Sequence, residues 1–136
     1  MAKPGSVIGW LLAEDDREKL LQQFPPKFEK TVAHHVTLKS EAERDPLPNE
    51  VKAEVVGHTD DESGVEAMVV AIDGTTDRPD GSTYHITWSL GPGREARESN
   101  DVIRALGWRR LKDGPVGVTL HPRRFDRLAA VPLDEC

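Results

Sequence analysis

The chain has 136 residues and a formal net charge of −6, from 24 acidic and 18 basic side chains. This length predicts a single domain over residues 1–136 with a core of its own. The acidic balance argues against a protein that holds duplex nucleic acid through general charge attraction. No apolar stretch approaches the roughly 20 residues of a membrane span, so we expect no membrane contact. The single cysteine, Cys136, excludes an intrachain disulfide, and the start of the chain is a poor signal peptide, so we expect a cytoplasmic protein.

The first half of the chain predicts four strands and one helix. A strand is expected over Ser6–Leu12 and a helix over Glu14–Phe24, which has acidic residues in its first turn and a proline pair after its end. Thr31–Lys39 is rich in β-branched residues and predicts a second strand. Val51–His58 and Val65–Ile72 predict two further strands joined as a hairpin by a polar loop.

The second half predicts two strands and a second helix. Thr83–Leu90 predicts a strand that ends at the turn Gly91-Pro92-Gly93. Ser99 is expected to cap a helix that runs to about Leu106. Val116–Leu120 alternates apolar residues with small ones and predicts the last strand. Six strands and two helices indicate an α+β protein with mostly antiparallel pairing.

Two of the predicted strands carry the same pattern of residues. One reads His35-Val36-Thr37 and the other reads His85-Ile86-Thr87. Side chains two residues apart on a strand lie on one face, roughly 7 Å apart. Each histidine therefore shares a face with its threonine, while the aliphatic residue between them faces the core. Two such strands side by side would frame a pocket with two imidazoles and two hydroxyls.

This set of groups suits chemistry at phosphorus. One neutral imidazole can take a proton while a charged partner gives one, because histidine titrates near neutral pH. The hydroxyls of Thr37 and Thr87 can donate to the phosphoryl oxygens, where negative charge builds up. We expect no cofactor and no metal, because two imidazoles cover both proton transfers. A zinc site is disfavoured, because no cysteine or carboxylate stands at ligand spacing from the histidines. Taken alone, either motif would be an ordinary pair of strand residues.

The paired motifs resemble those of the two-histidine (2H) phosphoesterase superfamily. The segments His34–Leu38 and Thr83–Leu90 are similar in particular to the cyclic phosphodiesterase domain of tRNA ligases and to 2′-5′ RNA ligase-like proteins. The resemblance implies a bilobed fold of mostly antiparallel sheets, with two helices packed outside and a central cleft lined by the two His-x-Thr strands. It also implies metal-independent chemistry on nucleotide phosphodiesters. The catalytic positions of the family fall on four residues, namely His35, Thr37, His85 and Thr87.

Four neighbouring residues are candidates for substrate binding. By strand alternation, Lys39 falls on the face of His35 and Ser89 on the face of His85. Arg94 follows the second motif across the glycine-rich turn and could steer a phosphate. Tyr84 has the alternation of a core residue, with a hydroxyl that needs a partner. By the same alternation, His34 is expected to point away from its neighbouring histidine, at the edge of the core.

The sequence therefore favours a small, metal-independent phosphodiesterase. The expected substrate is a nucleotide phosphodiester, above all a 2′,3′-cyclic phosphate on a nucleotide or an RNA 3′ end, and the protein is expected to be a monomer. Four alternatives stay open: a phosphodiesterase of cyclic oligonucleotide signals, an enzyme that joins RNA ends through a 2′-5′ bond, a non-catalytic module that binds a nucleotide or RNA end, and a purely structural protein.

Overall fold

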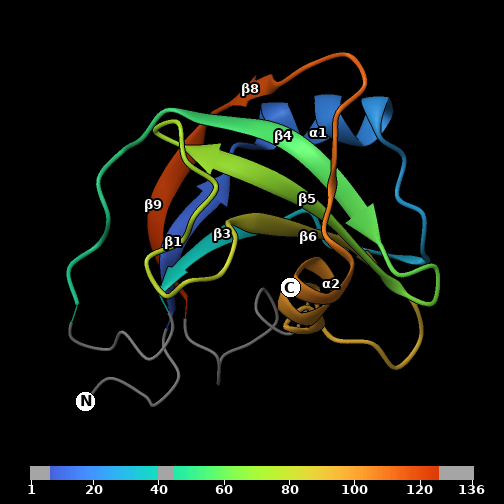
Figure 1. The fold of residues 1–136 in the computed structure, drawn as a ribbon. Helices are drawn as coiled ribbons and strands as arrows, with labels where there is room; N and C mark the ends of the chain where they lie inside the picture. Colours follow the sequence, from blue (N-terminus) through green and yellow to red (C-terminus); the bar gives the residue numbers. More distant parts are fainter. Residues whose placement is uncertain (1–6, 40–44, 126–136) are drawn as a thin grey trace.

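One antiparallel sheet organises the molecule. The computed structural model describes residues 7–39 and 45–125, and the predictions for Ser6 and Cys136 fall outside these ranges. Nine described strands form the sheet in the order β7-β4-β5-β6-β3-β1-β9, with β2 paired to β6 and β8 paired to β4 (Figure 1). The elements are β1 (Val7–Leu12), α1 (Glu14–Gln23), β2 (Lys30–Thr31), β3 (His35–Lys39), β4 (Ala53–Asp60), β5 (Val65–Ile72), β6 (His85–Leu90), α2 (Glu98–Leu106), β7 (Arg109–Arg110), β8 (Val116–Val118) and β9 (Leu120–Phe125).

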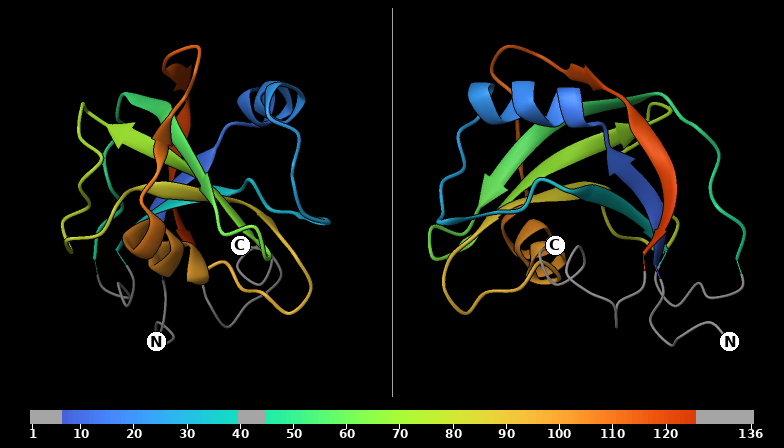
Figure 2. Two further views of the ribbon diagram at one scale, coloured as in Figure 1. Left: turned by 45° about the vertical axis from the view of Figure 1, so that its right-hand side comes forward. Right: turned by 180° about the vertical axis from the view of Figure 1, so that it is seen from behind.

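The two helices lie on opposite sides of the sheet. Figure 1 shows α1 above the strands and α2 below them, and the two views of Figure 2 agree. We call the two surfaces of the sheet the α1 face and the α2 face. The main core lies on the α1 face and includes Leu20 of the helix with Val36, Met68, Ile86 and Trp88 of the strands. A smaller cluster on the α2 face joins one helix residue to β5, and its buried members are Ala67, Val69 and Ile103.

β5 shows how the sequence encodes this arrangement. All eight of its residues are buried, in agreement with its nearly continuous apolar sequence VEAMVVAI. Such a run fits a strand that is covered on both faces. β4 is next to β5 and alternates between buried and more exposed residues along most of its length. The strand with the continuous apolar run therefore lies inside the sheet and under both helices.

The predicted strand over Thr31–Lys39 is divided into β2 and β3. Ala33 lies between the two parts with φ of 45°, a backbone conformation that is uncommon for a residue other than glycine. The guanidinium of Arg17 on α1 donates to the carbonyl oxygens of Val32 and Ala33, at 3.3 and 2.9 Å. These bonds hold the break in place, and the first His-x-Thr motif starts afresh at the beginning of β3.

Two further predictions of element boundaries were wrong. Ser99 does not cap α2: the helix begins at Glu98, the cap position is Arg97, and Ser99 is fully buried inside the first turn. The segment predicted as the last strand ends as β8, and β9 follows it as a sixth long strand at the sheet edge. β9 contains Pro122, which a strand tolerates at an edge because no neighbour there needs its missing N–H.

The α+β class, with a large antiparallel sheet and two helices, is confirmed. All described strands belong to one hydrogen-bonded sheet, and the two-lobed shape implied by the resemblance stays a prediction. In the described parts of the chain, no helix has the length and apolar character needed to cross a membrane.

Candidate functional site

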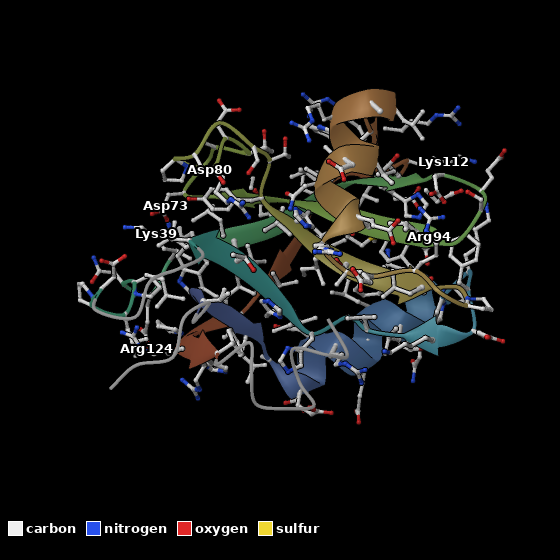
Figure 3. The ribbon with its side chains drawn as sticks, turned by 90° about the horizontal axis from the view of Figure 1, so that it is seen from below. Lys39, Asp73, Asp80, Arg94, Lys112 and Arg124 are labelled. Carbon is white, nitrogen blue, oxygen red and sulfur yellow. The ribbon has the colours of Figure 1, made fainter. Side chains whose placement is uncertain are left out.

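The two His-x-Thr strands are neighbours in the sheet. β3 and β6 pair antiparallel, with Val36 opposite Ile86. Both of these residues are fully buried in the core of the α1 face. The residues on either side of them therefore face the other way, toward the α2 face that Figure 3 shows. Two segments 50 positions apart in the sequence meet at the centre of one pair of strands.

The antiparallel direction fixes how the two motifs face each other. The histidine of each motif lies on the same side of the Val36–Ile86 pair as the threonine of the other motif. The two histidines are diagonal neighbours, and such positions are typically about 7–8 Å apart. A charge on His85 lowers the pKa of His35, so the two rings interact electrostatically. The motifs are thus related by a local two-fold axis through their central residues.

The ring of His85 has a defined tautomer. Its Nδ1 lies 2.9 Å from the carbonyl oxygen of Thr83. A carbonyl oxygen can only accept, so Nδ1 carries the hydrogen and, in the neutral ring, Nε2 carries the lone pair. Burial is the main cause that lowers the pKa of His85, and the nearby charge of Arg78 lowers it further. His85 is therefore neutral at pH 7, with Nε2 as a proton acceptor.

His35 belongs to a chain of three polar side chains. Its Nδ1 lies 3.0 Å from Nδ1 of His34, and its Nε2 lies 3.1 Å from Oγ1 of Thr37. When Nδ1 of His34 donates to Nδ1 of His35, the neutral ring of His35 carries its hydrogen on Nε2. This Nε2 lies next to the hydroxyl of Thr37. The prediction that His34 points away from His35 was wrong, because β3 begins only at His35 and strand alternation does not extend back to His34.

Burial dominates the protonation of His35. It lowers the pKa of this ring to about 3, and the neighbouring His34 and His85 lower it in the same direction. Phe125 of β9 packs against the imidazole, with ring centroids 4.5 Å apart. The pKa of His34 is lowered as well, by burial and by the charge of Arg17. All three histidines around the motifs are therefore neutral at pH 7.

The two threonines of the motifs differ in what they contact. Thr37 is half-buried, and its hydroxyl oxygen lies 3.1 Å from Nε2 of His35. Thr87 is buried under the first turn of α2, where its hydroxyl donates to the carbonyl oxygen of Ala96 at 3.2 Å and lies 2.8 Å from Oγ of Ser99. The only hydrogen of the Thr87 hydroxyl is thus committed to the helix. The structure thus brings Thr37 into contact with His35 and attaches Thr87 to α2.

Lys39 and Arg94 do not join the histidines. The ammonium group of Lys39 is exposed and pairs with Asp45 at 2.7 Å. Arg94 binds Asp61 at 2.8 Å and Glu98 at 3.0 Å, and so ties the β4–β5 loop to α2. Figure 3 shows Lys39 and Arg94 on opposite sides of the molecule. Arg94 has a structural role that its place after the second motif did not reveal.

Ser89 also lies away from the site, because the register of β6 shifts. Glu66 pairs with Ser89 and Ala67 pairs with Thr87, so β6 has one extra residue at this point and the alternation that predicts Ser89 beside His85 is broken. The fully buried hydroxyl of Ser89 donates to Glu66 at 2.6 Å. Burial opposes ionisation of Glu66, but hydrogen bonds from His58, the Lys27 backbone and Ser89 keep its pKa below the ordinary value.

Tyr84 is a core residue, as its alternation indicates, and not a residue of the site. It is buried in the cluster of the α1 face and packs edge-on against Trp10, with ring centroids 6.0 Å apart. Burial raises the pKa of its hydroxyl. The candidate role of Tyr84 in substrate binding is therefore not supported, because the ring lies on the face opposite His85.

Sequence reasoning missed Arg78. This residue lies in the β5–β6 loop, and its side chain is only 8% exposed. It contacts Asp80 within the loop and approaches the backbone of Thr37 on β3. The segment Arg78-Pro79-Asp80-Gly81 is a recognisable turn sequence. This sequence predicts the turn, but it does not predict the contact of the arginine with β3.

A separate pocket of about 890 Å³ lies along β4, β8 and β9. Its lining includes four carboxylates and none of the His-x-Thr residues; the carboxylates are Asp16, Glu50, Glu54 and Asp73. An acidic lining disfavours a phosphate. The histidine pair is therefore the better candidate for an anion site.

Comparisons with protein-family models, with curated proteins and with solved structures found no match. Within residues 7–39 and 45–125, no group of three or more His, Cys, Asp or Glu side chains is arranged to hold a metal ion. The candidate site therefore rests on its own geometry: the histidines and Thr37 on two paired strands, with Arg78 beside them.

Proposed function

We propose that the protein is a phosphodiesterase that hydrolyses a nucleotide phosphodiester, above all a 2′,3′-cyclic phosphate, by paired-histidine acid–base catalysis. The observation that carries this proposal is the antiparallel pairing of Val36 with Ile86. It brings two His-x-Thr segments into a two-fold arrangement on one face of the sheet. A phosphoryl group is a tetrahedral anion with an attacking oxygen and a leaving oxygen on opposite sides, and two diagonal imidazoles fit those two positions.

The tautomers suggest which ring has which role. Nε2 of His85 carries a lone pair, because Nδ1 donates to Thr83. His85 would take a proton from water as the water oxygen attacks phosphorus. His35 would give the proton on Nε2 to the ribose oxygen as its bond to phosphorus breaks. The hydroxyl of Thr37 would then be free to donate to a phosphoryl oxygen.

Substrate binding supplies the charge that this scheme needs. Both histidines have lowered pKa values, chiefly because burial disfavours their charged forms. A bound phosphodiester brings a negative charge against the rings, which raises the pKa of each. Binding would therefore take up one proton, and the protonated ring would act as the acid. Each positioned acid or base contributes typically about 10²–10⁴ in rate.

A second candidate is a non-catalytic module that binds a nucleotide or an RNA end. One observation favours it: the hydroxyl hydrogen of Thr87 is held by the carbonyl oxygen of Ala96. One of the four groups of the expected catalytic set is thereby withdrawn. Such a module would bind a 2′- or 3′-nucleotide without converting the cyclic phosphate.

The test is turnover of 2′,3′-cyclic nucleotides in the presence of EDTA, followed by chromatography of the products. We expect wild-type protein to open the ring, and His35→Asn and His85→Asn each to reduce kcat by about 10²-fold or more. His58→Asn is the matched control, because His58 contacts Glu66 and lies outside the site. Activity that survives both site substitutions, or that EDTA abolishes, would refute the mechanism. Nucleotide binding without turnover by wild-type protein would favour the binding module.

A further inference from the structure

Arg78 is held rigidly in the β5–β6 loop. Its Nε donates to Oδ1 of Asp80 at 3.1 Å, and its Nη2 donates to Oδ2 of the same carboxylate at 2.6 Å. Asp80 is fixed in turn by the backbone and the hydroxyl of Ser82, at 2.9 and 2.5 Å. The loop closes through a backbone bond from Gly81 to the Arg78 carbonyl oxygen, at 2.9 Å. This two-point contact sets the plane and the direction of the guanidinium.

The guanidinium also contacts β3 and acts electrostatically on β6. Its Nη1 lies 3.5 Å from the carbonyl oxygen of Thr37 on β3. Its charge acts on His85 of β6. The other candidate cations, Lys39 and Arg94, are each paired with carboxylates away from the histidines. Arg17 acts on His34 before the first motif, whereas Arg78 contacts Thr37 and acts on His85.

The hydrogen bonds of Arg78 are incomplete. A guanidinium has five N–H groups, and three bonds are present here, of which the one to Thr37 is long. Two N–H groups have no partner among the described residues, although the side chain is only 8% exposed. Arg94, which is more exposed, makes four bonds. All three guanidinium nitrogens of Arg78 are therefore engaged, and the two remaining N–H groups are left to an acceptor from outside the protein.

We propose that Arg78 binds the phosphoryl group of the ligand through its unused N–H groups, with Asp80 holding the guanidinium in position. The planar fork of an arginine matches two phosphate oxygens, and the bonds are strengthened by opposite charge. The inference rests on the proposed function for the identity of the anion. It adds that the recognised chemistry is the phosphoryl group itself, shared by a cyclic nucleotide, its opened product and free phosphate.

The experiment is a calorimetric titration of the full chain with inorganic phosphate. We expect wild-type protein to bind, Arg78→Met to bind about 10- to 100-fold more weakly, and Arg78→Lys to fall between them. Arg97→Met is the matched control, because Arg97 is exposed and pairs with Glu95. If Arg78→Met binds phosphate as tightly as wild-type protein, the inference is overturned. Absence of binding by wild-type protein overturns it as well.

Chemical rescue separates phosphate binding from a purely structural role. Methylguanidine added to Arg78→Ala should restore phosphate binding and should restore nothing in His85→Asn. Failure of rescue, in a variant whose melting curve matches wild-type protein, contradicts the inference. Failure of this inference and failure of the proposed function give different results. Phosphate binding that depends on Arg78, together with an absence of turnover, would sustain this inference and reject the phosphodiesterase.

Discussion

Thr37 and Thr87 occupy equivalent positions in the two motifs, but their surroundings separate their roles. Thr37 contacts His35 on the α2 face. Thr87 is 7% exposed and joins β6 to α2 through Ala96 and Ser99. The two equivalent threonines thus differ in role: Thr37 is placed to contact a ligand, and Thr87 anchors α2. The backbones of the two motifs are related by two-fold symmetry, but the hydrogen bonds of their hydroxyl groups are not.

Replacement of each threonine by valine tests this difference, because valine keeps the shape and removes only the hydroxyl. Thr87→Val leaves the buried Ser99 hydroxyl without its partner and removes one of the two hydrogen bonds to the Ala96 carbonyl oxygen, so we expect a loss of about 1–3 kcal/mol in the free energy of unfolding. Thr37→Val should cost less than about 1 kcal/mol, but should lower turnover by about 10²-fold. Urea unfolding and steady-state kinetics check the two effects. Equal losses of stability in both variants would contradict the assignment.

At the scale of single residues, the sequence predicts the motif faces well and their neighbours poorly. Strand alternation correctly places Ile86 and Trp88 in the core. It fails at Ser89, where the register of β6 shifts, and at His34, which precedes β3. Alternation is a local rule, and bulges and strand starts are decided by pairing with chain segments that are distant in sequence.

At the scale of elements, the contact of β1 with β3 supports the first motif. Gly9 pairs with Thr37 at a point where the register of the two strands shifts. A Cβ atom at Gly9 would lie 2.1 Å from the carbonyl oxygen of Val36. Only glycine allows the two backbones to approach so closely. The position of the His35 motif therefore depends on a residue that has no side chain.

Gly9→Ala should force β1 away from β3, because the obstructing atom is backbone and cannot rotate aside. We expect a loss of about 1–3 kcal/mol in the free energy of unfolding, as in overpacked cores. Gly117→Ala is the matched control: a Cβ there meets no atom within 4 Å, and we expect little change. Thermal and urea unfolding of both variants provide the measurement. A neutral Gly9→Ala variant would show that the close approach is dispensable.

Most of the longer elements are predicted by the sequence. The helix predicted from Glu14 and the strands around Val65–Ile72 and Thr83–Leu90 all form, with boundaries shifted by at most two residues. β7 and β9 were missed, because they are short or contain proline and exist only through their pairing with β4 and β1. Edge strands depend on their neighbour more than on their own residues.

At the scale of the whole molecule, buried neutral histidines make stability depend on pH. His35 has a pKa of about 3 in the folded protein, chiefly because it is buried, against about 6.5 in an unfolded chain. Between these values the unfolded state binds more protons than the folded state. The free energy of unfolding therefore rises with pH in this window and falls as the pH drops below about 6.5.

Urea unfolding between pH 6.5 and pH 5 measures this effect before most carboxylates titrate. We expect stability to decline on acidification, with a slope of at most about 1.4 kcal/mol per pH unit for each such group. His35→Asn should reduce the slope of the free energy of unfolding against pH by the contribution of one titrating group. His121→Asn is the control, because His121 lies on β9 outside the motifs. An unchanged slope in His35→Asn would mean that this ring is not held neutral by the fold.

Nitrogen-detected NMR of the imidazole rings tests whether residues 35 and 85 form one anion site. Wild-type protein is titrated at pH 7 with a nucleoside 2′-monophosphate, and the ring nitrogens of His35 and His85 are followed together. We expect both rings to shift along the same binding curve and one of them to gain a proton as its pKa rises. If only one ring responds, or if neither does while the nucleotide binds elsewhere, the two motifs do not share a ligand.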